Sequence, residues 1–136
     1  MTGESFQLPR HFQAEQRQLQ ASGLASWAAL TRLSDGDLRQ LAAMGDASEA
    51  RLKRLRQQAL LMTEAGLEAS EASLLLYAGI PSRQALAEAN PGMLHRQLLR
   101  VHRQLLGRAA PTLELAVVVA WIQRARSAAG SGRSGN

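Results

Sequence analysis

The residues best suited to chemistry are four arginines in one acid-free stretch of the chain. No acidic residue lies between Glu88 and Glu114. The arginines in that interval, here called the arginine row, are Arg96, Arg100, Arg103 and Arg108. Spacings of four and three place the first three on one face of a helix. Guanidinium groups in a row can follow a phosphate backbone and release its counterions, so the pattern predicts polyanion binding.

Two other uses of the arginine row remain open. Arginines on the outer face of a helix can simply be solvated and keep a leucine-rich core soluble, and they can also bind an acidic protein. A second basic set would extend the row if the two helices face the same way, and it consists of Lys53, Arg54 and Arg56. With a formal net charge of +5, the chain favours the backbone of DNA or RNA as its partner, with an acidic protein as the other candidate.

The remaining polar clusters lack the pattern of a catalytic or metal site. His95 and His102 are two helical turns apart, about 10 Å along the axis, which is too far to share one zinc ion. Glu64, Glu68 and Glu71 have no neighbouring histidine or aspartate, and acids near a helix start suit its dipole. No serine lies in a nucleophile elbow, and no nucleotide-binding glycine pattern occurs. We therefore expect no enzyme activity, no metal and no cofactor.

Length and composition limit the class of protein. A chain of 136 residues predicts one compact domain with a single core, at about 150 residues per domain. The absence of cysteine excludes disulfides and thiolate metal sites. The longest uncharged apolar stretch, residues 115–123, is shorter than the roughly 20 residues of a membrane helix. Glu4 and Pro9 interrupt any signal-peptide pattern, so we expect a cytoplasmic location without membrane contact.

The composition predicts an all-α fold with about eight short to medium helices. Leucine, alanine, glutamine and arginine dominate, whereas strand-favouring isoleucine and valine are scarce. The predicted helices cover about 10–21, 26–33, 35–41, 48–63, 69–77, 82–89 and 91–106, with a last one opening at Pro111. Residues 1–9 are expected to be frayed, and the Ser- and Gly-rich residues 127–136 to form a flexible tail.

The helix over 91–106 has the clearest pattern. Asn90 and Pro91 provide an N-cap and a proline at the first helical position. The predicted buried stripe consists of Leu94, Leu98, Val101 and Leu105. The first three residues of the arginine row fall on the opposite face.

Three segments share one spacing: an apolar residue, three residues, glycine, an apolar residue, four residues, alanine. Their glycine and apolar turn residues are Gly23 and Leu24, Gly66 and Leu67, and Gly79 and Ile80. A helix stops where only glycine tolerates a positive φ, and the next apolar residue then enters the core. The first and third copies also match over further positions at an offset of 56 residues. We predict a single domain over 10–126, made of repeat units 10–47 and 64–126 joined by a linker helix over 48–63.

The spacing from glycine to alanine is similar to that of the helix-hairpin-helix motif of DNA repair and recombination proteins. More specifically, residues 74–82 (LLLYAGIPS), 86–91 (LAEANP) and 121–126 (WIQRAR), together with Leu94, resemble the uncharacterised bacterial "domain of unknown function 4332". The resemblance covers about 51–126 and reaches back to Leu19 through the repeat. It implies a helix-hairpin-helix-like fold of a type frequent in cyanobacteria, and no established activity.

The hairpins depart from the DNA-binding pattern at one position. DNA-binding hairpins carry a second glycine two residues after the first, which lets backbone N–H groups approach a phosphate. Here these residues are Ala25, Glu68 and Pro81. Alanine weakens the feature, proline removes a donor, and glutamate places a negative charge there.

Two functions follow as expectations. The first is a non-enzymatic module that binds nucleic-acid backbone through the arginine row. The second is a helical protein–protein adaptor whose hairpins persist as scaffold after losing phosphate binding.

Overall fold

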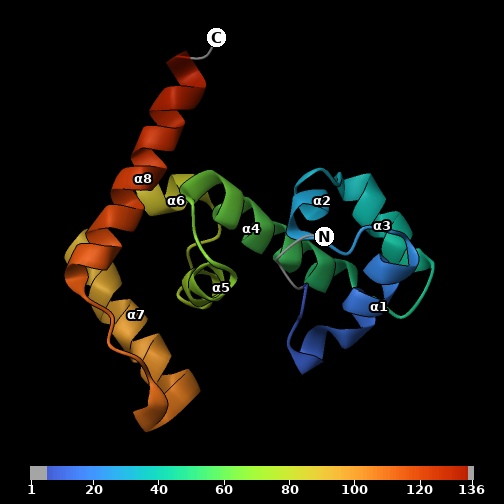
Figure 1. Ribbon diagram of the computed structural model, residues 1–136, viewed down its shortest axis with the longest axis horizontal. Helices are drawn as coiled ribbons and strands as arrows, with labels where there is room; N and C mark the ends of the chain where they lie inside the picture. The colour runs from blue at the N-terminus through green and yellow to red at the C-terminus, as the bar shows by residue number, and fades with distance from the viewer. Residues whose placement is uncertain (1–5, 135–136) are drawn as a thin grey trace. The chain divides into compact units, whose positions relative to one another are not determined.

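The computed structural model describes the backbone of residues 6–134 and the side chains of residues 6–127. All regular structure in this part is helical (Figure 1). In chain order the elements are η1 (Arg10–Phe12), α1 (Gln13–Ala21), α2 (Trp27–Thr31), α3 (Asp35–Ala43), α4 (Glu49–Ala65), α5 (Ala69–Tyr77), α6 (Arg83–Ala87), α7 (Pro91–Leu106), η2 (Gly107–Ala109) and α8 (Leu115–Ser134). The predicted all-α class is confirmed.

The chain divides into two compact units, and the division falls inside α4. Unit 1 is Met1–Ala59 and unit 2 is Leu60–Asn136. Each has its own core, whereas the chain length predicts a single one. The predicted linker helix is α4, which buries Leu52 and Leu55 in the core of unit 1 and Leu61 in that of unit 2. A helix of 17 residues is about 25 Å long, which allows its two ends to serve different cores.

Unit 1 packs α1, α2, α3 and the first part of α4 around leucines. The side chains of Leu19, Leu30, Leu38, Leu52 and Leu55 are fully buried. Their burial removes apolar surface from water and supplies most of the stability of this unit.

Residues 6–9 are fixed to unit 1, where the sequence predicts a frayed end. Leu8 is buried, and its N–H donates to Gln16 Oε1 at 3.1 Å. The Phe6 ring packs edge-on against Trp27, with 5.1 Å between ring centroids. The prediction is wrong for these residues because apolar contacts with α1 and α2 hold them, while residues 1–5 lie outside the described part.

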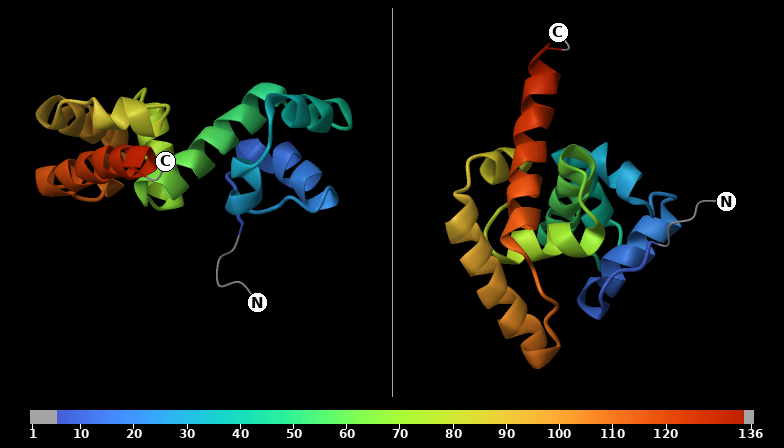
Figure 2. Two further views of the ribbon diagram at one scale, coloured as in Figure 1. Left: turned by 90° about the horizontal axis from the view of Figure 1, so that it is seen from above. Right: turned by 60° about the vertical axis from the view of Figure 1, so that its left-hand side comes forward.

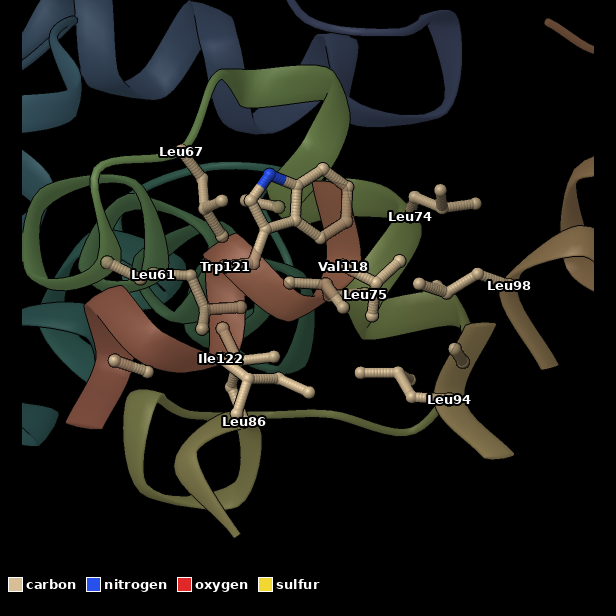
Figure 3. Packing of buried hydrophobic residues seen from close by; sticks show 14 of the residues in the cluster. Leu61, Leu67, Leu74, Leu75, Leu86, Leu94, Leu98, Val118, Trp121 and Ile122 are labelled. Carbon is tan, nitrogen blue, oxygen red and sulfur yellow. The ribbon is translucent and has the colours of Figure 1, made fainter. Parts of the chain in front are cut away.

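Unit 2 is built around α8. Val118, Trp121 and Ile122 of α8 pack among Leu75 of α5 and Leu86 of α6 (Figure 3). In both views of Figure 2, α8 lies beside α7 and α6. Trp121 is therefore a core residue of unit 2.

Both ends of α8 differ from the prediction. It begins at Leu115 and not at Pro111, because residues 110–114 are extended and bring Leu113 against the core. Its backbone stays helical to Ser134, where the composition predicts a flexible tail from residue 127. Residues 135–136 of that predicted tail lie outside the described part.

The three predicted glycine stops share one geometry. Gly23, Gly66 and Gly79 have φ of 71°, 65° and 87°. In each case the following N–H bonds to the carbonyl five residues earlier: Leu24 to Leu19 at 2.8 Å, Leu67 to Met62 at 3.1 Å and Ile80 to Leu75 at 2.9 Å. This pattern satisfies a carbonyl at the end of the helix. The glycine stops are confirmed, and the duplication of whole repeat units stays a prediction.

Candidate functional site

The start and the core face of α7 position the arginine row. Asn90 Oδ1 accepts a hydrogen bond from Met93 N–H at 3.0 Å, and Pro91 occupies the first turn. Leu94 and Leu98 are buried. These contacts fix the rotation of α7 about its axis, so the opposite face is turned to solvent.

The first three arginines of the row are open to solvent on one face. Arg96, Arg100 and Arg103 are exposed, and they line a shallow hollow together with Leu99 and Gln104. Within the part of the chain that the structure describes, no carboxylate oxygen lies within 4.0 Å of their guanidinium nitrogens. The predicted shared face is confirmed, and its charges are not neutralised by those described carboxylates.

Arg108 continues the row past the end of α7. Gly107, with φ of 59°, ends the helix. Arg103 and Arg108 line a second hollow with Leu99 and His102, so the two hollows share Leu99 and Arg103. The four cations thus border one continuous surface of unit 2.

The last turns of α7 extend beyond the core of unit 2. Leu105, predicted to be buried, is 50% exposed, and Leu106 is 49% exposed. The prediction for Leu105 is wrong because the buried stripe ends at Leu98 and only Val101 packs partly beyond it. Figures 1 and 2 show why: α8 begins part-way along α7, and only the connecting chain lies beside the final turns.

A histidine holds this connecting chain against α7. His95 Nε2 lies 2.7 Å from the Leu113 carbonyl oxygen. Because a carbonyl only accepts, His95 Nε2 carries the hydrogen and donates it. His102 Nδ1 is buried and has no hydrogen-bond partner among the described residues. The sequence places both histidines on the flank of the helix, but no sequence signal identifies a carbonyl 18 residues away as a partner.

The second basic set belongs to unit 1 and is engaged there. Arg56 donates to the Leu33 carbonyl at 2.9 Å and pairs with Asp35 at 2.6 Å. Lys53 Nζ lies 3.6 Å from Glu49. The hydrogen bond and the positive charge of Arg56 lower the pKa of the Asp35 carboxyl. The guanidinium of Arg56 thus ties α4 to the start of α3, and the extension of the row by this residue stays a prediction.

Arg54, the third member of this set, is half-buried and also lies in α4. It belongs to unit 1, whereas the arginine row belongs to unit 2. The structure thus assigns the two sets to different units.

Side chains within each hairpin bind one backbone amide of the turn region. In the first and third hairpins, Ser26 Oγ and Ser82 Oγ accept from the amides of Ala29 and Ala85 at 3.0 and 3.1 Å. The helices that follow, α2 and α6, have five residues each, so their dipoles are small. In the second hairpin, Glu68 N–H donates to its neighbour Glu71 at 2.9 Å. Each turn therefore has one amide bound to a side chain of its own segment, and in the second hairpin it is the amide two residues after the glycine.

The acidic residues of unit 2 also have local partners. Glu64 lies 3.9 Å from Arg83, and Glu71 accepts from the N–H of Glu68. Within residues 6–127, no three acidic, histidine or cysteine side chains come together in a way that could hold a metal ion.

One buried carboxylate, that of Glu15, is not predicted from the sequence. Glu15 of α1 is fully buried, and its Oε2 accepts from Ser48 N–H at 2.8 Å, while Oε1 has no partner among the described residues. Ser48 Oγ in turn accepts from Arg51 N–H at 3.3 Å and so caps α4. The carboxylate of Glu15 thus lies at the positive end of α4, where the helix dipole favours it.

A family model described as "Domain of unknown function (DUF4332)" matches residues 9–128. This chain belongs to the DUF4332 family. The matched DUF4332 region contains the whole arginine row and all three hairpin turns. No curated protein and no solved structure matches the chain. Among the described residues, no helix has the length and apolar character needed to span a bilayer.

Proposed function

We propose that this DUF4332 chain is a non-enzymatic, helix-hairpin-helix-like module that binds the phosphate backbone of nucleic acid through the arginine row. One observation carries the proposal: three exposed guanidinium groups border one hollow of α7, and no described carboxylate pairs with them. A surface of this kind has a positive potential that nearby acids do not cancel, and it attracts a polyanion. A cytoplasmic location would bring it into contact with DNA and RNA.

The spacing of the row fits a nucleic-acid strand. Arg96 and Arg103 are seven residues apart, which is about 10.5 Å along a helix axis. One strand of a duplex presents a charge every 3.4 Å of its axis, so about three phosphates lie within that length. Three arginines can therefore meet three phosphates without bending the ligand.

Contacts of this type carry no sequence information, because every nucleotide has the same phosphate. Four contacts give a slope of about −3.6 for log K against log salt concentration. Between 150 and 50 mM salt this slope corresponds to about 50-fold tighter binding. Non-specific affinity at physiological salt is expected at about 10⁻⁴ to 10⁻⁶ M.

The test is fluorescence anisotropy at about 50 mM salt with short labelled nucleic acids, both duplex and single strand. We compare wild type with the triple variant Arg96→Gln, Arg100→Gln, Arg103→Gln. A matched control removes three exposed charges from unit 1 through the changes Arg17→Gln, Arg32→Gln and Arg51→Gln.

We expect the triple variant to lose at least tenfold in affinity, while the control stays within about twofold of wild type. Absence of wild-type binding at this salt, or equal loss in both variants, would rule the proposal out.

A second function, a protein–protein adaptor, is favoured by a different observation. Leu105 and Leu106 are half exposed and lie in the sequence between Arg103 and Arg108. Apolar side chains rimmed by cations suit an acidic amphipathic helix. Under this alternative, Leu105→Ser with Leu106→Ser abolishes capture of one acidic protein and leaves duplex affinity unchanged. If the double change weakens duplex binding but does not weaken the capture of any protein, the adaptor function is rejected.

A further inference from the structure

The two units have the same order of elements up to their third helix. Unit 1 contains the hairpin α1–α2 followed by α3, and unit 2 contains, after the end of α4, the hairpin α5–α6 followed by α7. At a constant offset of 56 residues, the buried positions correspond as Leu19 and Leu75, Leu30 and Leu86, and Leu38 and Leu94. The N-caps of the third helices, Ser34 and Asn90, correspond at the same offset. The two units therefore present equivalent scaffolds to this point.

The fourth helices correspond at a different offset. α4 begins at Glu49 and α8 at Leu115, 66 residues later. At this offset the buried positions correspond as Leu52 and Val118, Leu55 and Trp121, and Ala59 and Ala125. The change from 56 to 66 means that unit 2 contains ten additional residues between its third and fourth helices.

The additional residues lie at the end of α7 and directly after it. α7 has 16 residues and α3 has 9. The connection in unit 1 is residues 44–46, followed by Ala47, which packs on its core. Its counterpart in unit 2 is residues 100–112, followed by Leu113, which also packs on its core. We call residues 100–112 the appendage.

The appendage adds nothing fully buried to the core of unit 2. All of its residues are described, and each is exposed or only partly buried. Ordering such a segment costs conformational entropy, which the small burial of Val101 and His102 offsets only in part. A segment of this kind is typical of a functional addition to a scaffold.

We infer that the appendage is a duplex-binding element, so that nucleic-acid binding belongs to unit 2 alone. This inference rests on the proposed function. Arg100, Arg103 and Arg108 all lie in the appendage, and only Arg96 precedes it. Unit 1 has Gln40 at the position that corresponds to Arg96, and its short connection carries Asp46 in place of arginines.

The make-up of the appendage selects a duplex over a single strand. Sequence-tolerant binding of single strands depends on aromatic side chains that stack on the bases. No Phe, Tyr or Trp side chain lines either hollow of the arginine row, where the only aromatic ring is that of His102, and Trp121 of unit 2 is buried. Binding is then electrostatic, with slopes of about −0.9 per contact for a duplex and −0.7 for a single strand. If the two affinities are equal at 1 M salt, this difference over four contacts makes duplex binding about tenfold tighter at 50 mM salt.

The experiment removes the appendage from the full chain. One variant replaces residues 100–112 by Met-Gly-Asp, the connecting residues 44–46 of unit 1, and keeps Leu113. A second variant leaves the segment in place and carries Arg100→Gln, Arg103→Gln and Arg108→Gln, so that the test does not depend on folding of the first. The control is again Arg17→Gln, Arg32→Gln, Arg51→Gln in unit 1. All four proteins are titrated by anisotropy with a short labelled duplex and with the single strand of the same sequence.

We expect wild type and control to bind the duplex about tenfold more tightly than the single strand at 50 mM salt. Both appendage variants should lose at least tenfold in duplex affinity. Equal wild-type affinity for the two probes overturns the inference and leaves the proposed function intact. A loss in the control as large as in the appendage variants contradicts both the inference and the proposed function. Wild-type protein that binds neither probe contradicts the proposed function itself.

Discussion

Replacing Gly79 by alanine tests the turn geometry on which the hairpins depend. Gly79 has φ of 87°, and a Cβ built there meets no atom within 4 Å. The substitution therefore costs backbone strain and creates no clash. A left-handed conformation costs an L-residue about 1–2 kcal/mol, while the smaller entropy of the unfolded chain returns about 0.4–1 kcal/mol. We expect Gly79→Ala to lower the free energy of unfolding by about 1 kcal/mol.

Two matched substitutions separate this strain from other effects. Gly79→Asn should cost less than Gly79→Ala, because asparagine tolerates the left-handed region better. Gly36→Ala in α3, where φ is not positive and the nearest atom is Ser34 Oγ at 3.7 Å, should stabilise by about 0.5 kcal/mol. Urea unfolding, followed by the fluorescence of Trp27 in unit 1 and Trp121 in unit 2 and by circular dichroism, measures all three. The reasoning is refuted if the Gly79→Ala protein is as stable as wild type, or if Gly79→Asn lowers the free energy of unfolding more than Gly79→Ala does.

Four further substitutions test the packing, one buried hydrogen bond and one ion pair. Leu86→Ala should cost about 2–5 kcal/mol because Leu86 is fully buried, whereas Leu105→Ala, at a half-exposed site, should cost under about 0.5 kcal/mol; equal urea midpoints contradict this. Glu15→Ala should lower the free energy of unfolding by about 1–3 kcal/mol, because it removes the buried carboxylate that accepts from the Ser48 N–H. An unchanged urea midpoint would show that water replaces the carboxylate. Asp35→Asn should be less stable than wild type at neutral pH but not in acid. The lowered pKa of Asp35 stabilises the fold above the ordinary pKa of about 3.9, and this stabilisation is lost as the pH falls through the lowered pKa. A stability difference from wild type that stays constant down to pH 2 contradicts the prediction.

Much of the secondary structure could be predicted because its signals are local. The Ser34 capping box and the Asn90 cap each lie within three residues of the amide they bind. The stops at Gly23, Gly66 and Gly79 depend only on the conformation of one residue. Interactions of such short range can be recognised from neighbouring residues in the sequence.

The division into two cores could not be predicted in the same way. The apolar stripe of α4 looks continuous in the sequence, and only the tertiary packing sends Leu55 to one core and Leu61 to the other. For the same reason Phe6 and Leu8 look like part of a polar, frayed end until Trp27 and Gln16 are placed beside them. Long-range contacts override local propensity at such sites.

The candidate site contains features that local spacing predicts and features that depend on long-range contacts. Spacing alone places Arg96, Arg100 and Arg103 on one face of α7, and the structure agrees. Spacing also gives Leu105 a core position, which is wrong because the neighbouring helix α8 begins too far back to cover it. The pairing of Arg56 with Asp35 spans 21 residues and removes a cation that the sequence counts as free.

The salt dependence of duplex binding tests the central claim most directly. Affinities of wild type, the control variant and the Arg96→Gln, Arg100→Gln, Arg103→Gln variant are measured between about 50 and 200 mM salt. Four phosphate contacts predict a slope near −3.6 for wild type and control, and the single remaining contact predicts about −0.9 for the triple variant. A wild-type slope near zero, or one that the three arginine changes leave unaltered, would contradict backbone binding by the arginine row.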